Sequence, residues 1–272
     1  MTAHLFIPDT QVRANEPTDH LRWAGRFILE KRPDVIVHAG DHWDMPSLSP
    51  WDRGKIQFEG RRYKADIQAG NTAFRLLDAP TDQHNRRRKM DRFFPRRVFL
   101  RGNHEYRVQR AIEENPVLDG TIGYEDMDTR GWEVHDFLKP VCIDGVWYAH
   151  YWQNPLTGKP IGGQAQTMLK TLGHSFVQGH RQVYESANRF VAGRRQNAVI
   201  AGAFYLHDEE YKGYQGNAHW RGILMFHEVR DGAFDIMEVS LDYLCRRYEG
   251  VPLGEFLREG YPEQAGTLWT TP

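Results

Sequence analysis

Polar side chains able to bind metals or transfer protons follow five short apolar runs of this 272-residue chain, each with the character of a buried strand. These side chains fall in residues 9–11, 40–44 and 102–105, at His150, and in residues 179–182. The carboxyl ends of parallel strands line the ligand crevice of open α/β sheets. Five strand ends meeting there would bring together aspartate, asparagine, histidine and glutamine, a donor set suited to hard or borderline divalent metals.

In chain order these segments are Asp-Thr-Gln, Gly-Asp-His-Trp-Asp, Gly-Asn-His-Glu, His and Gly-His-Arg-Gln. This order resembles the signature of the calcineurin-like metallophosphoesterases, and the resemblance extends over residues 5–182. Gly-Asn-His-Glu is the most specific of the five motifs, whereas Gly-His-Arg-Gln alone carries little weight. The chain also resembles the members of this family that bacteriophages encode.

The resemblance implies a site with two divalent metal ions, and attack on phosphorus by a hydroxide held between them. Asp41 would bridge both ions and so take part directly in catalysis. The other ligands would form two sets, with Asn103, His150 and His180 on one ion, and Asp9, Gln11 and Gln182 on the other.

The resemblance implies that His104 is the general acid. It would donate a proton to the leaving group or stabilise charge in the transition state. Glu105 would orient His104, and Asp44 would brace the loop or a neighbouring ligand. His42 fills a variable slot of the family pattern, so we expect it to pack or to support a ligand rather than to bind metal.

Glutamine stands at positions 11 and 182, where the family usually has histidine. A glutamine carbonyl is neutral, as imidazole is, but it replaces a nitrogen donor with a harder oxygen. The substitution therefore shifts the metal preference away from Zn²⁺ and toward Mn²⁺ or Mg²⁺, and it predicts weaker binding of this ion. We expect Mn²⁺ as the bound metal, with Mg²⁺ or Zn²⁺ as alternatives.

The same chemistry follows from the residue types alone. Two divalent ions about 3.5–4 Å apart lower the pKa of a water molecule between them and neutralise phosphate oxygens during in-line attack. The chain has no Gly-x-Ser-x-Gly elbow and no P-loop, and its two cysteines, Cys142 and Cys245, lie outside the motifs. These absences exclude the common serine hydrolases and the P-loop nucleotidases.

Residues 51–101 carry 14 lysines and arginines against six acids, a net charge of +8, so the rest of the chain carries −9. One interpretation is a solvated face, and the other is a surface that follows the phosphates of a polyanionic substrate. Arg61 and Arg62 are the residues of this segment best placed to reach substrate. A stretch rich in glycine and asparagine, residues 213–217, is a further candidate for a loop over the site.

The elements that must position these residues begin with a βαβ unit: strands at residues 4–8 and 34–39, and a helix at residues 18–31. A third strand is expected at residues 97–100, and the later chain is rich in short strands. This order predicts an α/β protein with two sheets and helices outside them, and the resemblance implies a four-layer α-β-β-α sandwich. We expect one domain, residues 1–272, with a basic helical cap inserted at about 45–97, whose helix covers residues 61–77.

Composition limits the remaining function classes. A net charge of −1 excludes a generally basic coat protein for nucleic acids, and the 40% hydrophobic residues predict a folded core. The sequence contains no run of about 18 apolar residues that could span a membrane, and no signal peptide is apparent. We therefore expect a cytoplasmic protein, in the host cytoplasm if a phage encodes it, that does not act at a membrane; the oligomeric state stays open.

The predicted function is metal-dependent hydrolysis of a phosphate ester. A phosphodiester is favoured, since one general acid and a basic rim suit an extended anionic substrate such as a nucleotide or nucleic acid. The alternatives are a DNA or RNA nuclease, a phosphomonoesterase, or a non-catalytic module that holds a phosphorylated partner. The two glutamines favour the last alternative, whereas an intact His104 opposes it, because a binding module needs no acid.

Overall fold

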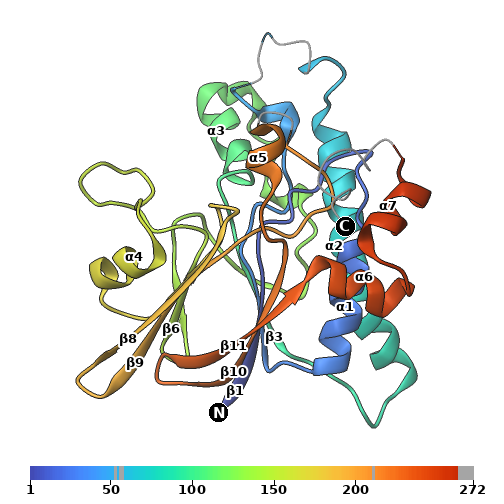
Figure 1. The fold of residues 1–272 in the computed structure, drawn as a ribbon. Helices are drawn as coiled ribbons and strands as arrows, with labels where there is room; N and C mark the ends of the chain where they lie inside the picture. Colours follow the sequence, from blue (N-terminus) through green and yellow to red (C-terminus); the bar gives the residue numbers. More distant parts are fainter. Residues whose placement is uncertain (52–53, 55–57, 210–211, 263–272) are drawn as a thin grey trace.

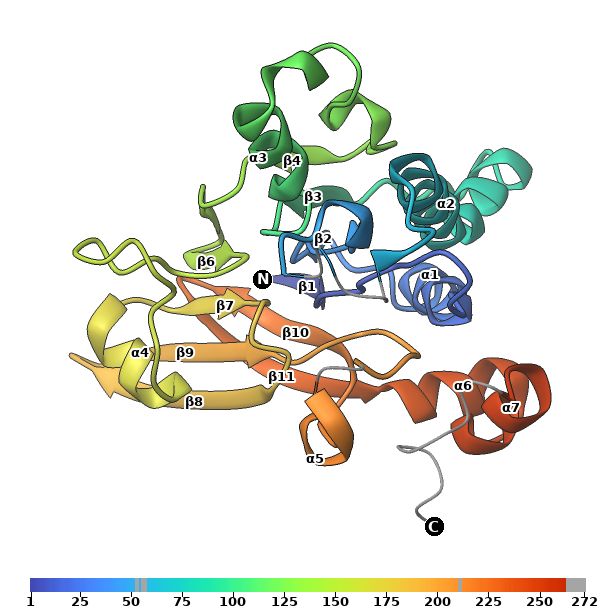
Figure 2. The same ribbon diagram turned by 90° about the horizontal axis from the view of Figure 1, so that it is seen from above.

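The computed structural model describes residues 1–51, 54, 58–209 and 212–262 and contains two β-sheets that pack face to face (Figures 1 and 2). The six-stranded sheet has the order β11-β10-β1-β2-β3-β4. Its strands are β1 (Thr2–Ile7), β2 (Val35–His38), β3 (Arg96–Leu100), β4 (Glu133–His135), β10 (Gly222–Arg230) and β11 (Ala233–Ser240). Strands β1 to β4 run parallel, whereas β10 is antiparallel to both of its neighbours.

The second sheet has five strands in the order β5-β6-β7-β9-β8. They are β5 (Val141–Ile143), β6 (Val146–Ala149), β7 (Phe176–Gln178), β8 (Tyr184–Val191) and β9 (Arg194–Ala201). Strands β6, β7 and β9 are parallel, so the carboxyl ends of β6 and β7 lie at one edge of the sheet.

Alternation along the strands assigns each side chain to one of two cores. In β1, Phe6 points between the sheets, whereas Leu5 and Ile7 point to the helices outside. In β9, Val199 points between the sheets and Ile200 packs on the outer face. Each sheet therefore buries both faces, which requires a helical layer on each outer side.

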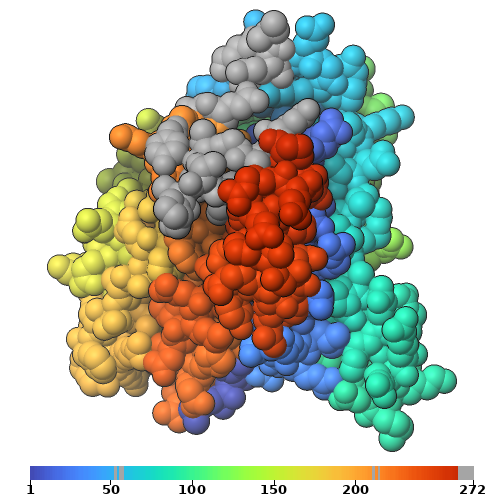
Figure 3. All heavy atoms as spheres, turned by 45° about the vertical axis from the view of Figure 1, so that its right-hand side comes forward, coloured from blue at the N-terminus to red at the C-terminus, as the bar shows by residue number. Residues whose placement is uncertain are grey.

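Helices supply those two layers. On the outer face of the six-stranded sheet lie α1 (Asp19–Lys31), α2 (Tyr63–Arg87), α6 (Leu241–Glu249) and α7 (Leu253–Gly260). On the other outer face lies α4 (Ala165–Leu172) (Figure 2). Figure 3 shows the red α6–α7 segment on the surface against blue N-terminal residues, where Trp23 Nε1 donates a 2.6 Å hydrogen bond to Glu249. The predicted four-layer α-β-β-α sandwich is confirmed.

Two expectations about local structure need correction. Helix α2 continues to Arg87 rather than ending at residue 77. Its last turns are fixed by Asn85, whose amide exchanges two 2.8 Å hydrogen bonds with the backbone of Phe93, a contact that periodicity does not reveal. Residues 213–217 form the short helix α5 (Gly213–Asn217) rather than an open loop.

The basic segment around residues 45–97 contains the 3₁₀ helix η1 (Pro46–Leu48) and α2. The apolar face of α2 shares the core of α1, so this helix forms part of the outer layer. Residues 52–53 and 55–57 of the segment lie outside the described residues. The single-domain boundary stays a prediction. Among the described residues, no helix combines the length and the apolar character that crossing a bilayer requires.

Candidate metal centre

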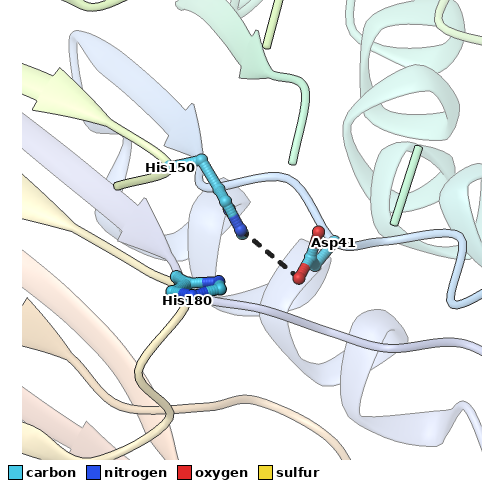
Figure 4. Close-up of side chains that lie close together, drawn as sticks. All are labelled: Asp41, His150 and His180. Atoms are coloured by element: carbon cyan, nitrogen blue, oxygen red, sulfur yellow. Dashed lines mark ion pairs between the residues drawn. The ribbon is translucent and has the colours of Figure 1, made fainter. Parts of the chain in front are cut away.

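Five loops that follow β1, β2, β3, β6 and β7 carry the polar residues singled out in the sequence. Three of these residues, Asp41, His150 and His180, each offer a ligand atom within 4.8 Å of the other two (Figure 4). Asn103 joins them, because its Oδ1 lies 2.9 Å from Nε2 of His150. The residues expected on one ion are therefore brought together by two adjacent strand ends of each sheet, those of β2 and β3 and those of β6 and β7.

His150 is held so that one ring nitrogen faces this cluster. Its Nδ1 donates a 2.8 Å hydrogen bond to the carbonyl of Ala39, which leaves Nε2 3.3 Å from Oδ2 of Asp41. Burial lowers the pKa of His150, but Asp41 outweighs it and raises that pKa to about 9. A cation that binds Asp41 would compete with this proton.

Asp41 is buried at the centre of the cluster. Its Oδ1 accepts a 2.8 Å hydrogen bond from the backbone N–H of His104, and Oδ2 faces His150. Burial raises the pKa of Asp41, but the histidines around it dominate and lower it well below the usual range. Asp41 is therefore an ionised carboxylate suited to binding a divalent cation.

Glycines allow the loops to approach this closely. A Cβ on Gly179 would lie 2.3 Å from Oδ1 of Asp9, and one on Gly102 would lie 2.1 Å from Oδ1 of Asp41. Asp41 and His180 themselves adopt left-handed backbone conformations, with φ of 45° and 67°. Such strain costs roughly 1 kcal/mol or more per residue and is typical of functional loops.

Glu105 holds two of these loops together. Its buried carboxylate accepts backbone N–H bonds from Gly102 (2.8 Å), Asp41 (2.9 Å), His42 (2.7 Å) and Trp43 (3.0 Å). The expectation that Glu105 orients the His104 imidazole differs from this arrangement. Glu105 instead anchors the backbone that presents Asp41.

The orientation of His104 comes from Asp44, whose Oδ1 lies 2.5 Å from Nδ1 of the imidazole. Nε2 of His104 lies 3.6 Å from Oδ2 of Asp41, and the Nη2 of Arg107 is 3.0 Å away. Burial and Arg107 lower the pKa of His104, but the carboxylates of Asp41 and Asp44 dominate and raise it. The two carboxylates therefore favour the protonated imidazole, whereas Arg107, which can only donate a hydrogen bond, favours a neutral imidazole that accepts at Nε2.

Arg13 extends this network, because its guanidinium binds both Asp44 and the buried Glu209. His42 lies in the support of the loop: Nδ1 is 2.7 Å from Thr10 Oγ1, and Nε2 is 3.0 Å from the carbonyl of Gly70 in α2. The described contacts of His42 therefore agree with a supporting role.

The residues expected on the other ion are arranged differently. Asp9 is buried, and its Oδ1 accepts a 2.9 Å hydrogen bond from the backbone N–H of His180. Burial raises the pKa of Asp9 to about 7. Oδ2 of Asp9 and Oε1 of Gln11 are buried oxygens with no hydrogen-bond partner among the described residues. Two buried acceptors without a donor indicate a site that favours a cation.

Gln182 does not complete this second ligand set. Its Oε1 accepts hydrogen bonds from the hydroxyl of Tyr205, at 3.1 Å, and from the ammonium group of Lys212. These donors use both lone pairs of the carbonyl oxygen, so it is not available as a metal ligand. The cluster of Asp41, Asn103, His150 and His180 fits one divalent ion, whereas Gln182 does not fit a second.

Arg61 and Arg62 lie at the start of α2. Arg61 donates a 3.3 Å hydrogen bond to the carbonyl of Pro46 and so braces η1. Arg62 lines a cleft of about 690 Å³ between α2 and residues 121–126, together with Lys64 and Arg75. The lining of this cleft holds these three basic side chains and one acid, Asp126, and it includes none of the residues of the metal centre.

No protein-family profile matches the chain. The Gene 54 protein of Mycobacterium phage D29 is 32% identical over 85 residues, which cover 29% of this chain and 33% of that protein. The chain therefore matches only about a third of the length of this curated relative.

Two solved structures overlap most of the chain at low similarity. An archaeal phosphodiesterase has 10% identity and a TM-score of 0.38, covering 87% of this chain and 99% of its own. A second structure has 12% identity and a TM-score of 0.39, covering 88% and 99%. None of these similarities places the chain in a family, so its assignment depends on the geometry of the site.

Sequence reasoning missed four residues around the cluster: Arg13, Tyr205, Glu209 and Lys212. None lies in a motif, and each acts through a contact with a residue far away in the chain. The one available signal was the pair of glutamines at positions 11 and 182, which indicated that the second ion position is unusual.

Proposed function

We propose that this chain is a metal-dependent phosphoesterase that hydrolyses a phosphodiester. The observation that carries the proposal is the cluster of buried Asp41 and His150 with half-buried His180, and the imidazole of His104 held beside it by Asp44. A divalent-ion site with an adjacent protonated imidazole is the minimum equipment for displacement at phosphorus. Sites that combine a divalent ion with an imidazole also hydrolyse other kinds of bond. The choice of a phosphate ester as substrate therefore depends on the charges of the surrounding residues.

The ion would be held by Asp41, Asn103, His150 and His180. We propose Mn²⁺, because the donor set mixes carboxylate and amide oxygens with imidazole nitrogens. When bound, the ion supplies positive charge to phosphate oxygens and lowers the pKa of a water molecule at the site. The second ion implied by the resemblance stays a prediction, and the contacts of Gln182 do not support it.

His104 would donate the proton to the leaving oxygen. Asp44 fixes Nδ1, so Nε2 is the nitrogen that faces Asp41 and the reacting group. The carboxylates of Asp41 and Asp44 raise the pKa of His104 and so favour the proton that this step requires. A leaving group that departs with a proton avoids the cost of a free alkoxide.

The substrate class follows from charge. The cleft lined by Arg62, Lys64 and Arg75 has one acid, Asp126, and therefore an excess of positive charge, which supports a substrate with several phosphates, such as a nucleotide or nucleic acid, that reaches from the metal centre to this cleft. A phosphomonoester needs no such extension. Because a cleft of this kind also suits other polyanions, the nuclease hypothesis requires its own assay.

The test compares hydrolysis of bis-p-nitrophenyl phosphate with that of p-nitrophenyl phosphate by metal-stripped protein supplied with Mn²⁺, Mg²⁺ or Zn²⁺. We expect diester turnover with Mn²⁺ that is lost in Asp41→Asn and falls by about 10²-fold or more in His104→Ala. The exposed His227→Ala variant is the matched control and should retain full activity. Turnover confined to the monoester contradicts the diester proposal, and silence under all three metals favours the non-catalytic module.

A further inference from the structure

We infer that the ammonium group of Lys212 is a built-in cation that takes the place of a second metal ion, so that the site holds one divalent ion. The ion count follows from the contacts of the site, whereas the contact of Lys212 with a phosphate rests on the proposed function. The two parts are therefore tested separately.

The carbonyl oxygen of Gln182 is already occupied by hydrogen-bond donors. This oxygen accepts hydrogen bonds from Lys212 and from Tyr205, and it is the only acceptor of this side chain. A metal ion at this position would have to displace an ammonium group and also stand beside its charge. Gln182 is 6% exposed, so water screens that repulsion only weakly.

Carboxylates surround the ammonium group of Lys212. The pKa of Lys212 is lowered overall, because burial is the largest effect, although the carboxylates of Glu209 and Asp9 act in the opposite direction. Asp9, which the resemblance assigns to the second ion, is therefore within electrostatic reach of the ammonium group. The buried oxygens of Asp9 and Gln11 lack hydrogen-bond partners among the described residues, so the pocket retains acceptors for a cation or for donors carried by a substrate.

Hydrogen bonds and ion pairs fix the positions of Lys212 and Glu209. The backbone N–H of Lys212 donates a 3.0 Å hydrogen bond to the carbonyl of Glu209. The buried side chain of Asn217 accepts the N–H of Glu209 and donates to its carbonyl, both at 2.9 Å. Glu209 in turn binds Arg13, whose guanidinium also binds Asp44. Lys212 is therefore positioned by the same network that orients His104.

An ammonium ion differs from a metal ion in ways that matter for the chemistry. It carries one positive charge rather than two, and it offers N–H donors to oxygens but does not coordinate water. At this position it would neutralise one phosphate oxygen of a bound substrate while the divalent ion serves another. One divalent ion and the ammonium group would then together neutralise the phosphate oxygens, whereas the resemblance implies two divalent ions.

The experiment is a Mn²⁺ titration of metal-stripped full-length protein, followed by calorimetry and by elemental analysis after gel filtration. We expect one equivalent in the wild type. The triple variant Lys212→Met, Gln11→His, Gln182→His should bind a second equivalent of Mn²⁺. Its Kd for that equivalent should be at least about 10-fold lower than the Kd of any second equivalent bound by the wild type. Lys170→Met, at an exposed lysine of α4, is the control and should bind as the wild type does.

Each outcome decides something. Two equivalents in the wild type overturn the inference even if the triple variant does not fold, and one equivalent in a folded triple variant overturns it as well. If neither the wild type nor Asp41→Asn binds Mn²⁺, the proposed function is refuted together with this inference. Binding of inorganic phosphate to the Mn²⁺-loaded protein that weakens about 10-fold in Lys212→Met supports the phosphate contact, and no change refutes that contact.

Discussion

Replacing Glu105 with glutamine should weaken both the fold and the metal centre. In the protein, Oε1 accepts the N–H groups of His42 and Trp43, and Oε2 accepts those of Asp41 and Gly102, all within 2.7–3.0 Å. A glutamine keeps the shape but places an NH₂ group against two of these four donors. Two buried N–H groups then lose their acceptor.

The magnitude follows from the cost of an unsatisfied buried donor. At about 1–3 kcal/mol for each, the two groups should together lower the free energy of unfolding by about 3 kcal/mol. For a chain of this size the melting temperature should fall by roughly 6–12 °C. The affinity for Mn²⁺ should fall as well, because the displaced loop carries Asp41.

Urea denaturation of the metal-free protein at pH 7, followed by tryptophan fluorescence, measures the first effect, and Mn²⁺ titration measures the second. Glu259→Gln, at an exposed position of α7, is the matched control and should leave the unfolding free energy unchanged. If Glu105→Gln changes that free energy by less than about 0.5 kcal/mol, the four hydrogen bonds do not organise the loops and the reasoning fails.

Three further changes test other parts of the structure. Gly179→Ala places a Cβ 2.3 Å from Oδ1 of Asp9 and should cost about 1–3 kcal/mol of stability, whereas Gly260→Ala, in open space, should cost nothing; thermal melting compares the two. Burial lowers the pKa of His20 well below that of an unfolded histidine, so stability is lost as pH falls below about 6.5. Urea denaturation at pH 7, 6 and 5 should show a decline about 1.4 kcal/mol per pH unit steeper in the wild type than in His20→Leu, and equal slopes would contradict this. Asp44→Asn removes the charge that helps raise the pKa of His104, so diester hydrolysis should fall about 10-fold and its alkaline limb should move to lower pH; an unchanged profile would exclude His104 as the acid.

The parallel strands β1, β2 and β3 were predictable because their signal is local, whereas the short parallel strand β4 was not predicted. The runs around Leu5, Val37 and Phe99 are apolar and β-branched or aromatic, and each ends at a polar loop, so both the strands and the edge that carries the site follow from the sequence. Strand β8 was not predicted, because its residues are half exposed and polar and it is held by pairing with β9. The end of α2 was missed for a similar reason, since Asn85 and Phe93 meet only in the fold.

The candidate site divides in the same way. The convergence of Asp41, His150 and His180 follows from motif spacing and from the rule that parallel strand ends share an edge. The contact of Lys212 with Gln182 does not follow, because the two residues are 30 positions apart and no periodicity relates them. Likewise, Glu105 could be identified as supporting the site, but which group it binds depends on how two loops meet.

The origin of the ligands in distant parts of the chain has a consequence for how the protein folds. Asp41 and His180 are separated by more than half of the chain, and the two sheets that carry them must pack before an ion can be held. The chain loses the conformational entropy of closing such long loops before the contact can stabilise it. The metal centre should therefore assemble late on the folding pathway. Ion binding therefore reports the arrival of the complete tertiary structure rather than guiding its early steps. Refolding with and without Mn²⁺ should consequently proceed at similar rates, while unfolding becomes slower in the presence of the ion.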